Sequence, residues 1–390
     1  GTADPNMRLV KVTVSWTEPS SGAKSIQLAN YVTDWQFMNS FIYYFHQTNK
    51  SDFAAGIVNN VDPDLRPGDL VLKRTNIYSH NFNLLAGSNP ADWNDTAANY
   101  SLSSQDNFRI YNLSGELVFG TISTLANIHT HYNGSGYRFW TNYEVKGRMK
   151  LTNLQGGAGV TFFSQYVGQD KYFRMYTNDG QSFRIDGRNT ALTALGVDDR
   201  DTEVVPVANT WYNFRIQAKD VSNQTLIIAK VWQQGTLEPA SWQVDCYSAE
   251  SSRPSAGGVG FWTTDQGSKY FDDLEVVNLN QYQTAGTLES STFDTGQASN
   301  FDKIRWNVYK PAGTTLRFQV RTADTQAGLA TASWYGPTGT SDYFQTNSLG
   351  EKLPSVLDGH RWVQYKAYLD TTSNTISPSL EDITISYAKQ

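Results

Sequence analysis

Apolar residues recur at every second position along most of the chain, in short runs that end in Gly, Asn, Asp or Pro. The pattern is clearest from Tyr137 to Val277, where Val, Ile, Phe, Tyr, Trp and Thr fill several such runs. A period of two is the spacing of side chains on a strand with one buried face, and turn residues between the runs are typical of antiparallel hairpins. The pattern therefore predicts an all-β fold of two antiparallel β-sandwich or jelly-roll domains with an N-terminal β-hairpin.

The length and the pattern together divide the chain into parts. A chain of 390 residues is longer than one typical domain. We expect a β-hairpin at 1–35, a packed linker at 36–75, a sandwich at 76–279 and a second β-sandwich module at 280–390. The linker is too apolar to remain a solvated tether. Within the last module, the Gly/Ser/Thr-rich insertion 325–360 is long enough to be functional or partly mobile.

The N-terminal run alternates cleanly, with Val10, Val12, Val14 and Trp16 on one face of the expected strand. Together with its return strand it reads RLVKVTVSWTEPSSGAKSIQLANYVTDW. This run resembles the C-terminal hairpin of minor type IV pilins and pseudopilins. The resemblance implies a long apolar pilin helix before the first residue and pilus subunits as partners. The alternative interpretation is an ordinary hairpin that docks on the sandwich, because two strands alone are marginally stable.

The order of motifs in 76–279 resembles that of the concanavalin A-like (laminin-G-like) lectin and glucanase sandwiches of bacterial surface proteins. The matching parts are Trp93, Val160–Phe162, Trp211–Tyr212, Gly257–Phe261 and Tyr270–Asp273. The run RWVQYKAYLDTT near the C-terminus resembles a jelly-roll module that follows such sandwiches. These resemblances imply a fold and an extracellular or cell-surface location in bacteria. They leave the activity open, because this fold carries lectins, hydrolases and inert spacers.

Charge and cysteine content narrow the function classes. The formal net charge of −6 provides no broad basic surface, so we expect neither nucleic acid nor an anionic membrane as a partner. Cys246 is the only cysteine, which excludes an internal disulfide and a multi-cysteine metal site. No run of about 18 apolar residues occurs, so we expect no membrane-spanning helix.

A candidate carbohydrate-binding face follows from the alternation in one pair of runs. If Phe173 and Met175 point into the core, then Tyr172, Arg174 and Tyr176 point to the other face. Aromatic rings stack on sugar rings, and Arg and Asp form forked hydrogen bonds with hydroxyls. The alternative is a solvated face with ordinary Tyr–Arg pairs. The candidate ligand-binding residues are Tyr172, Arg174, Tyr176, Arg184, Asp186 and Trp262.

The resemblance also implies a structural calcium ion where the closing strand meets the opening strand. The candidate ligands are Asp272, Asp273, His80 and Asn81, because calcium takes carboxylate and carbonyl oxygens. Alternation puts the two aspartates on opposite faces, so at most one of them is expected to bind. The alternative is two ordinary edge-strand acids.

Two further patterns argue against a histidine metal site and against glycosidase catalysis. His129 and His131 have the spacing of two ligands on one strand face, but no third ligand lies near in sequence, so we interpret them as polar loop residues. The Glu-x-Asp-x-x-Glu run of glycosidases with this fold is absent from the sequence, and Glu116, Glu144 and Glu203 are isolated. The sequence therefore favours a non-catalytic surface protein, an adhesin or minor pilin-like subunit, that binds a glycan or surface polymer. A polysaccharide hydrolase and a structural spacer are the alternatives.

Overall fold

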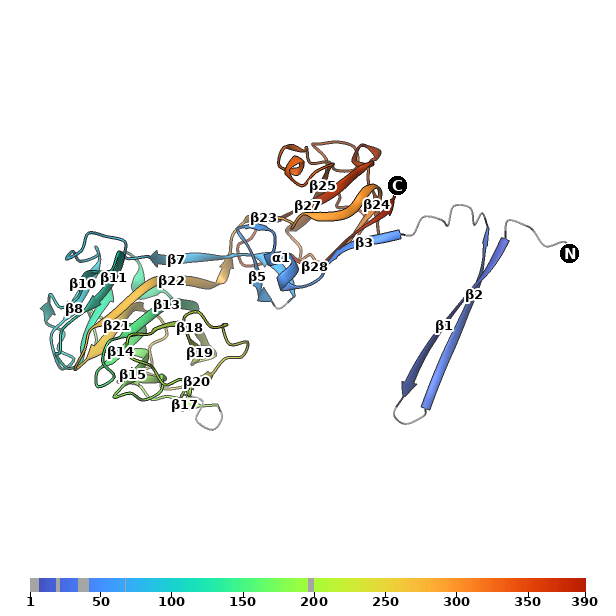
Figure 1. Cartoon of the computed structure of the whole chain (residues 1–390). Helices are drawn as coiled ribbons and strands as arrows, with labels where there is room; N and C mark the ends of the chain where they lie inside the picture. Colours follow the sequence, from blue (N-terminus) through green and yellow to red (C-terminus); the bar gives the residue numbers. More distant parts are fainter. Residues whose placement is uncertain (1–6, 19–21, 34–41, 67, 196–199) are drawn as a thin grey trace. The chain divides into compact units, whose positions relative to one another are not determined.

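The computed structural model describes residues 7–18, 22–33, 42–66, 68–195 and 200–390. Strands dominate these residues and every paired strand is antiparallel, which confirms the predicted all-β fold (Figure 1). No helix in the described part is long and apolar enough to cross a membrane. The chain forms two compact units, which we call the sandwich unit (Arg74–Tyr282) and the split unit (Gly1–Lys73 with Gln283–Gln390).

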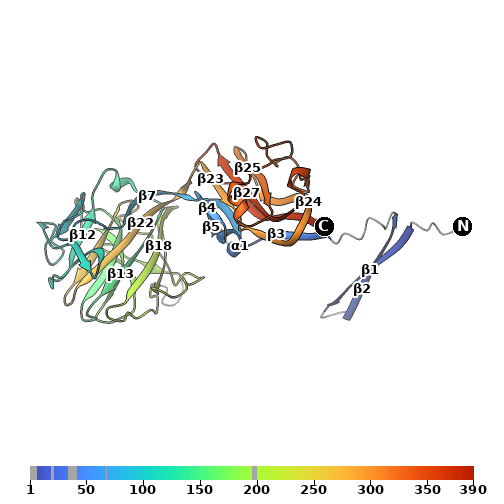
Figure 2. The ribbon, with the colours of Figure 1, turned by 45° about the horizontal axis from the view of Figure 1, so that its top comes forward.

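The sandwich unit contains two sheets, whose strands lie side by side in Figure 2. The nine-strand sheet has the order β10 (Arg109–Leu113), β11 (Glu116–Thr121), β22 (Lys269–Tyr282), β13 (Tyr143–Leu151), β18 (Trp211–Val221), β19 (Gln224–Gln233), β20 (Val244–Ser248) and β17 (Thr193–Ala194), with β7 (Arg74–His80) also paired to β22. The seven-strand sheet has the order β16 (Arg184–Arg188), β15 (Tyr172–Asn178), β14 (Gly157–Ser164), β21 (Gly258–Thr264), β12 (Ile128–Tyr132), β8 (Trp93–Thr96) and β9 (Ser104–Gln105). A single 3-10 turn, η2 (Tyr137–Phe139), is described in this unit.

One apolar core lies between the two sheets of the sandwich unit. In β18 the residues Tyr212, Phe214 and Ile216 are buried while their neighbours are half-buried, as a period of two requires. Phe261 of the seven-strand sheet stacks on Phe271 of the nine-strand sheet with ring centroids 4.1 Å apart. Burial of these large rings contributes most of the driving force for closing the sandwich.

Short turns set the register of neighbouring strands. Ser222 and Asn223 have positive φ angles of 50° and 65° and join β18 to β19, which pair from Val221 with Gln224 onward. Two central residues with positive φ make the type I′ turn that matches the twist of an antiparallel pair. This turn fixes which residues of β18 face the core.

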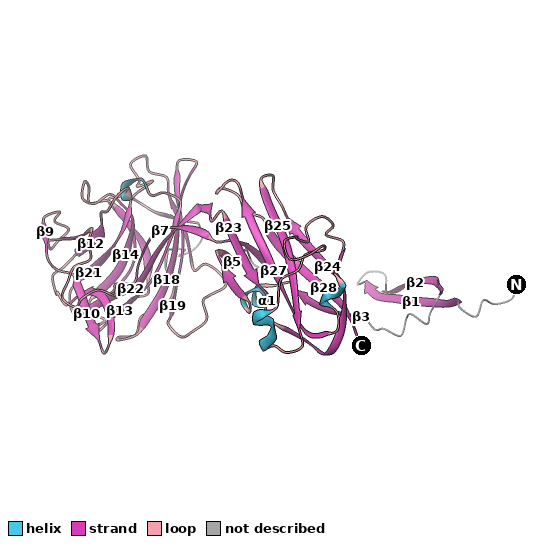
Figure 3. Cartoon of the chain, turned by 90° about the horizontal axis from the view of Figure 1, so that it is seen from above, coloured by secondary structure: helices cyan, strands magenta, loops and turns pink. Residues whose placement is uncertain are grey.

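The split unit contains a ten-strand arrangement drawn from both ends of the chain (Figure 3). Its main path is β4 (Ile57–Asn59), β23 (Ala285–Glu289), β27 (His360–Thr371), β24 (Phe293–Tyr309), β28 (Ser379–Lys389), β6 (Asp69–Leu72) and β5 (Val61–Arg66). Three strands pair off this path: β25 (Thr314–Ala323) with β27, β26 (Glu351–Lys352) with β24, and β3 (Ile42–Gln47) with β28. Short helical segments are α1 (Lys50–Ala54), η3 (Ala327–Thr331) and η4 (Ser355–Leu357).

Residues 42–66 and 68–73 of the segment 36–75, which was expected to be a linker, belong to this unit. Its described part supplies β3 to β6 and α1, and Phe45, Phe53 and Leu70 are buried in the unit. These strands are three to six residues long, too short for a clear period of two in the sequence. The segment is therefore part of the domain and not a connector.

The N-terminal hairpin consists of β1 (Met7–Glu18) and β2 (Gly22–Thr33), paired in register from Met7 with Thr33 to Glu18 with Gly22. The rest of the segment 1–35, namely 1–6, 19–21, 34 and 35, lies outside the described residues. The hairpin itself was expected, and its pilin origin stays a prediction.

Candidate functional site

The outer face of the seven-strand sheet has glycines on its two central strands. A Cβ atom on Gly159 of β14 would lie 2.5 Å from the Met175 carbonyl oxygen and 2.5 Å from Cβ of Tyr176. A Cβ atom on Gly260 of β21 would lie 2.6 Å from Nδ1 of His131. These distances are far below van der Waals contact, so only glycine allows the neighbouring side chains to lie across the sheet.

Arg174 lies between two aromatic rings on this face. Its guanidinium carbon is 4.1 Å from the ring centroid of Tyr176 and 4.2 Å from that of Trp262. The two rings meet edge to face with centroids 5.3 Å apart. Trp262 is only 2% exposed, and its Nε1 and one terminal nitrogen of Arg174 are buried without a hydrogen-bond partner among the described residues. The rings hold the guanidinium plane in one orientation through cation–π contacts.

A polar pocket of about 210 Å³ adjoins this stack. Arg184 lies 3.6 Å from a carboxylate oxygen of Asp201 and donates a hydrogen bond to Gln181 at 2.8 Å. The Asp186 carboxylate accepts the backbone N–H of Gly187 at 2.9 Å. The pocket therefore offers both cationic donors and anionic acceptors. Its lining residues are Tyr176, Arg184, Ile185, Asp186, Arg200 and Asp201.

The structure thus brings together five of the six predicted ligand-binding residues, but Trp262 is buried beneath Arg174 and Tyr176, so it supports the face and offers no surface to a ligand. Tyr172 does not line the pocket, and it is also fully buried. Tyr172 contacts His129 and pairs across the strands with Arg188, and Tyr100 packs on both of these residues: Arg188 lies 3.8 Å from the Tyr100 ring centroid, and that ring meets His129 edge to face. The prediction for Tyr172 is corrected, since a loop distant in sequence covers its face of the sheet.

Next to Tyr172, His129 and His131 form a buried hydrogen-bonded chain on β12. Nδ1 of His129 lies 3.1 Å from Nε2 of His131, and the Tyr172 hydroxyl lies 3.3 Å from Nε2 of His129. The Ser164 hydroxyl lies 3.0 Å from Nδ1 of His131. Two neutral rings satisfy all three contacts with one proton each. The expectation of polar loop histidines is wrong, because both residues are at most 2% exposed in a strand.

Burial keeps the hydrogen-bonded groups His129, His131 and Tyr172 uncharged. It lowers the pKa of His131 to about 3, and burial together with the charge of His131 lowers the pKa of His129 well below its usual value. Burial also raises the pKa of Tyr172. All three groups are therefore neutral at physiological pH. The sequence signal for the two histidines was their i, i+2 spacing; in the structure His131 lies opposite Gly260 of β21 and His129 lies opposite Trp262.

The predicted calcium ligands Asp272 and Asp273 are both paired with one cation. Arg148 donates to Asp272 at 2.5 Å and lies 3.0 Å from Asp273. The β22–β13 register shifts between Lys146 and Arg148, and Asp273 has a positive φ of 53°. This bulge overturns the expectation that the two aspartates lie on opposite faces, because it turns both toward Arg148.

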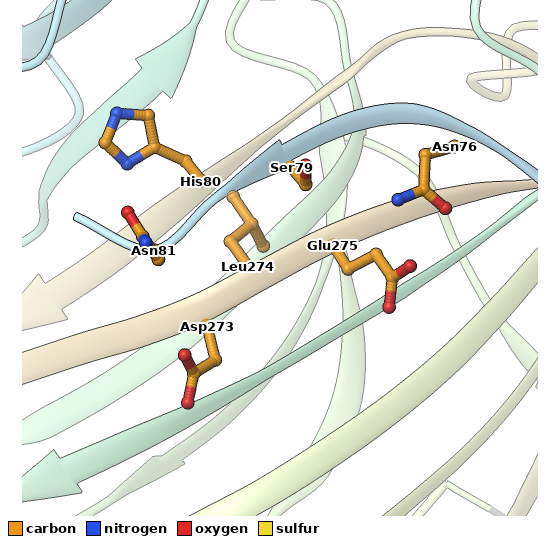
Figure 4. Close-up of a pocket in the computed structure, with 7 residues that line it drawn as sticks. All are labelled: Asn76, Ser79, His80, Asn81, Asp273, Leu274 and Glu275. Carbon is orange, nitrogen blue, oxygen red and sulfur yellow. The ribbon is translucent and has the colours of Figure 1, made fainter. Parts of the chain in front are cut away.

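The other two predicted calcium ligands, near His80 and Asn81, were expected to contribute carbonyl oxygens, and the His80 side chain points away from Asp273 (Figure 4). His80 and Asn81 line a pocket of about 480 Å³ together with Asp273, but Figure 4 shows the His80 imidazole and the Asp273 carboxylate pointing in opposite directions. Nδ1 of His80 accepts the backbone N–H of Phe82 at 2.7 Å. In the part of the chain that the structure describes, no three His, Cys, Asp or Glu residues gather as a metal-binding group. The arginine between the two aspartates offers no oxygen ligand, whereas calcium takes six to eight oxygens, and a calcium ion held partly by backbone carbonyls near His80 and Asn81 stays a prediction.

Comparison with known proteins gives structural neighbours only. No protein-family model and no curated protein matches the sequence. Similar solved structures include a protein of unknown function with a galectin-like fold from Bacillus subtilis, at 11% identity over 53% of this chain and 97% of that chain, with a TM-score of 0.36. A cellulose-induced protein has 15% identity over 51% of this chain and 96% of that chain, with a TM-score of 0.35. A GH131 β-glucanase catalytic domain from Podospora anserina has 8% identity over 52% of this chain and 95% of that chain, with a TM-score of 0.31.

Proposed function

We propose that the outer face of the seven-strand sheet binds a carbohydrate without changing it chemically. The observation that carries this proposal is the half-buried Tyr176 ring, held by Arg174, at the edge of a pocket with charged hydrogen-bonding groups. An oriented aromatic ring offers an apolar surface for a sugar ring. Around it, Arg184 donates to sugar hydroxyls, and Asp186 and Asp201 accept from them.

The sugar site is the basis for a role at the bacterial cell surface. In this proposal the chain is an extracellular adhesin or minor pilin-like subunit, and the sandwich unit contacts a glycan or another surface polymer. The sequence resemblance of residues 8–35 to pilin hairpins supports pilus subunits as further partners. A structural spacer is the alternative role for the same architecture, and it requires no ligand.

A hydrolase is less well supported, because the clustered carboxylates are neutralised by cations. Glu144 and Glu275 lie 3.5 Å and 3.6 Å from the amine of Lys146 on the outer face of the nine-strand sheet. Burial alone would raise the pKa of Glu144, but Arg215, 2.8 Å away, the charge of Lys146 and the hydrogen bond of Gln217 together outweigh burial and lower it. A glycosidase acid needs a raised pKa to remain protonated, so Glu144 is the wrong group for that task.

A glycan array probed with the full chain tests the proposal. We expect binding to at least one class of glycan, and we expect Tyr176→Ala and Arg184→Ala to reduce that binding at least tenfold. The matched control is Tyr309→Ala, because Tyr309 is an exposed tyrosine on a strand of the split unit. Absence of binding to any glycan would overturn the proposed function. Release of new reducing ends from a bound polysaccharide would replace it with the hydrolase.

A further inference from the structure

No acidic side chain lies within 4.0 Å of the Arg174 guanidinium among the described residues. Its neighbours are paired: Arg188 lies 2.8 Å from Asp170, and Arg184 lies 3.6 Å from Asp201. Asp186 is the cross-strand register partner of Arg174, but no ion pair within 4.0 Å joins them in the described part. Burial and His131 lower the pKa of His129 most, and the charges of Arg174 and of the paired Arg188 lower it further.

The aromatic stack prepares this guanidinium for a planar anion. Tyr176 and Trp262 hold it on two sides, so a ligand need not order a free side chain. Arg174 is half-buried, which makes a charge pair stronger than in open water and still leaves part of the side chain at the surface. A carboxylate accepts two parallel hydrogen bonds from a guanidinium, a match that a hydroxyl cannot provide.

The adjoining pocket also has more positively than negatively charged side chains around it. Arg184 and Arg200 line it with Asp186 and Asp201, and Arg174 beside it adds a cation that has no acid within 4.0 Å among the described residues. Counted over these described residues, the excess of positive charge occurs on a chain whose formal net charge is −6. A neutral sugar would leave the excess uncompensated, whereas an acidic sugar would neutralise it.

We propose that the ligand is an acidic glycan whose uronate-type carboxylate pairs with Arg174 while its ring lies on Tyr176. This inference rests on the proposed carbohydrate-binding function and specifies its substrate class. The carboxylate forms the fork with the guanidinium, and the ring hydroxyls reach the polar groups of the pocket.

The test uses sugars that differ only in the carboxylate. Oligosaccharides of galacturonate, glucuronate and mannuronate are each presented as free acid and as methyl ester, together with neutral and sulfated glycans, and dissociation constants are measured at two salt concentrations. We expect at least one free acid to bind tenfold or more tightly than its ester. Arg174→Gln should remove this preference and leave the weaker ester binding, and Arg174→Lys, which keeps the charge without the fork, should lie between the two.

The matched control is Arg317→Gln in the split unit. Arg317 also lies on an aromatic ring, 4.4 Å from the centroid of Tyr343, but it has a carboxylate partner in Asp370 at 3.3 Å. This variant should bind as the unmodified chain does. Equal binding of acid and ester, a preference that survives Arg174→Gln, binding of neutral glycans alone, or equal binding of sulfated glycans would overturn the inference and leave the proposed function standing. If nothing on the panel binds, both fail.

Discussion

Nδ1 of His129 and Nε2 of His131 lie 3.1 Å apart inside the sandwich unit, although both imidazoles come from the outer face of their sheet. Tyr166 stacks on His131 with ring centroids 4.6 Å apart, and Tyr100 covers His129. The pair is sealed from water by loops and satisfied by its own hydrogen bonds. A polar chain of this kind is stable only while both rings remain neutral.

Acid should therefore destabilise the sandwich unit through this pair. Unfolded histidines titrate near the ordinary pKa of about 6.5, whereas His131 keeps a folded pKa of about 3. The unfolded state binds more protons between these values, so stability falls as pH decreases from about 6.5 toward about 3. At pH of about 5 the loss from His131 is on the order of 2 kcal/mol.

Urea unfolding at pH 7 and pH 5 measures this effect. The difference between the two unfolding free energies should shrink in His131→Gln, which cannot take up the proton. It should stay unchanged in His46→Gln, because His46 is exposed on a strand of the split unit. An unchanged pH dependence in His131→Gln would show that other groups cause the acid loss.

The glycines beneath the candidate site give a second prediction. Gly159→Ala places a Cβ 2.5 Å from a backbone oxygen of the neighbouring strand, which cannot move without breaking the pairing. We expect a loss of about 1–3 kcal/mol, the usual cost of overpacking. Gly168→Ala is the control, because its nearest neighbour would be 3.6 Å away. Thermal unfolding of both variants decides the matter, and equal melting temperatures would contradict the packing argument.

The sequence predicted which residues of a strand share a face, but not what covers that face. Phe173 and Met175 are buried and Arg174 and Tyr176 are half-buried, as the period of two requires. Tyr172 obeys the same alternation and is still buried, because the covering residue Tyr100 lies about 70 positions earlier in the chain. Local periodicity contains no information about such long-range contacts.

The position of the bulge and the pairing partner of each strand could not be predicted from the sequence for a similar reason. The bulge that turns Asp272 and Asp273 toward Arg148 adds one residue to β22, and alternation across it fails. The pairing of β3 with β28 joins residues from opposite ends of the chain. The pattern in each strand indicates its buried side, whereas the choice of partner depends on the packing of the whole domain.

The insertion 325–360 of the split unit, expected to be functional or partly mobile, is anchored in the structure. Phe344 is fully buried and exchanges two backbone hydrogen bonds of 2.9 Å with Phe318 of β25. Phe344→Ala should cost about 3 kcal/mol or more, because it leaves a cavity in a packed core. Leu349→Ala, at a side chain 84% exposed in the same insertion, should change stability by less than about 0.5 kcal/mol. Rapid proteolysis within the insertion of the unmodified chain would contradict this anchoring.

Arg148 holds the place that calcium was predicted to occupy. Because its guanidinium already pairs with both Asp272 and Asp273, we expect millimolar calcium to leave the melting temperature unchanged. Arg148→Ala should destabilise the chain by about 3 kcal/mol, since it leaves the buried Asp272 carboxylate without its cation. Arg109→Ala is the control, because its partner Asp106 is exposed and the pair contributes little. A calcium-dependent rise in melting temperature that disappears in Asp273→Asn would restore the predicted calcium site and reject an arginine-only role.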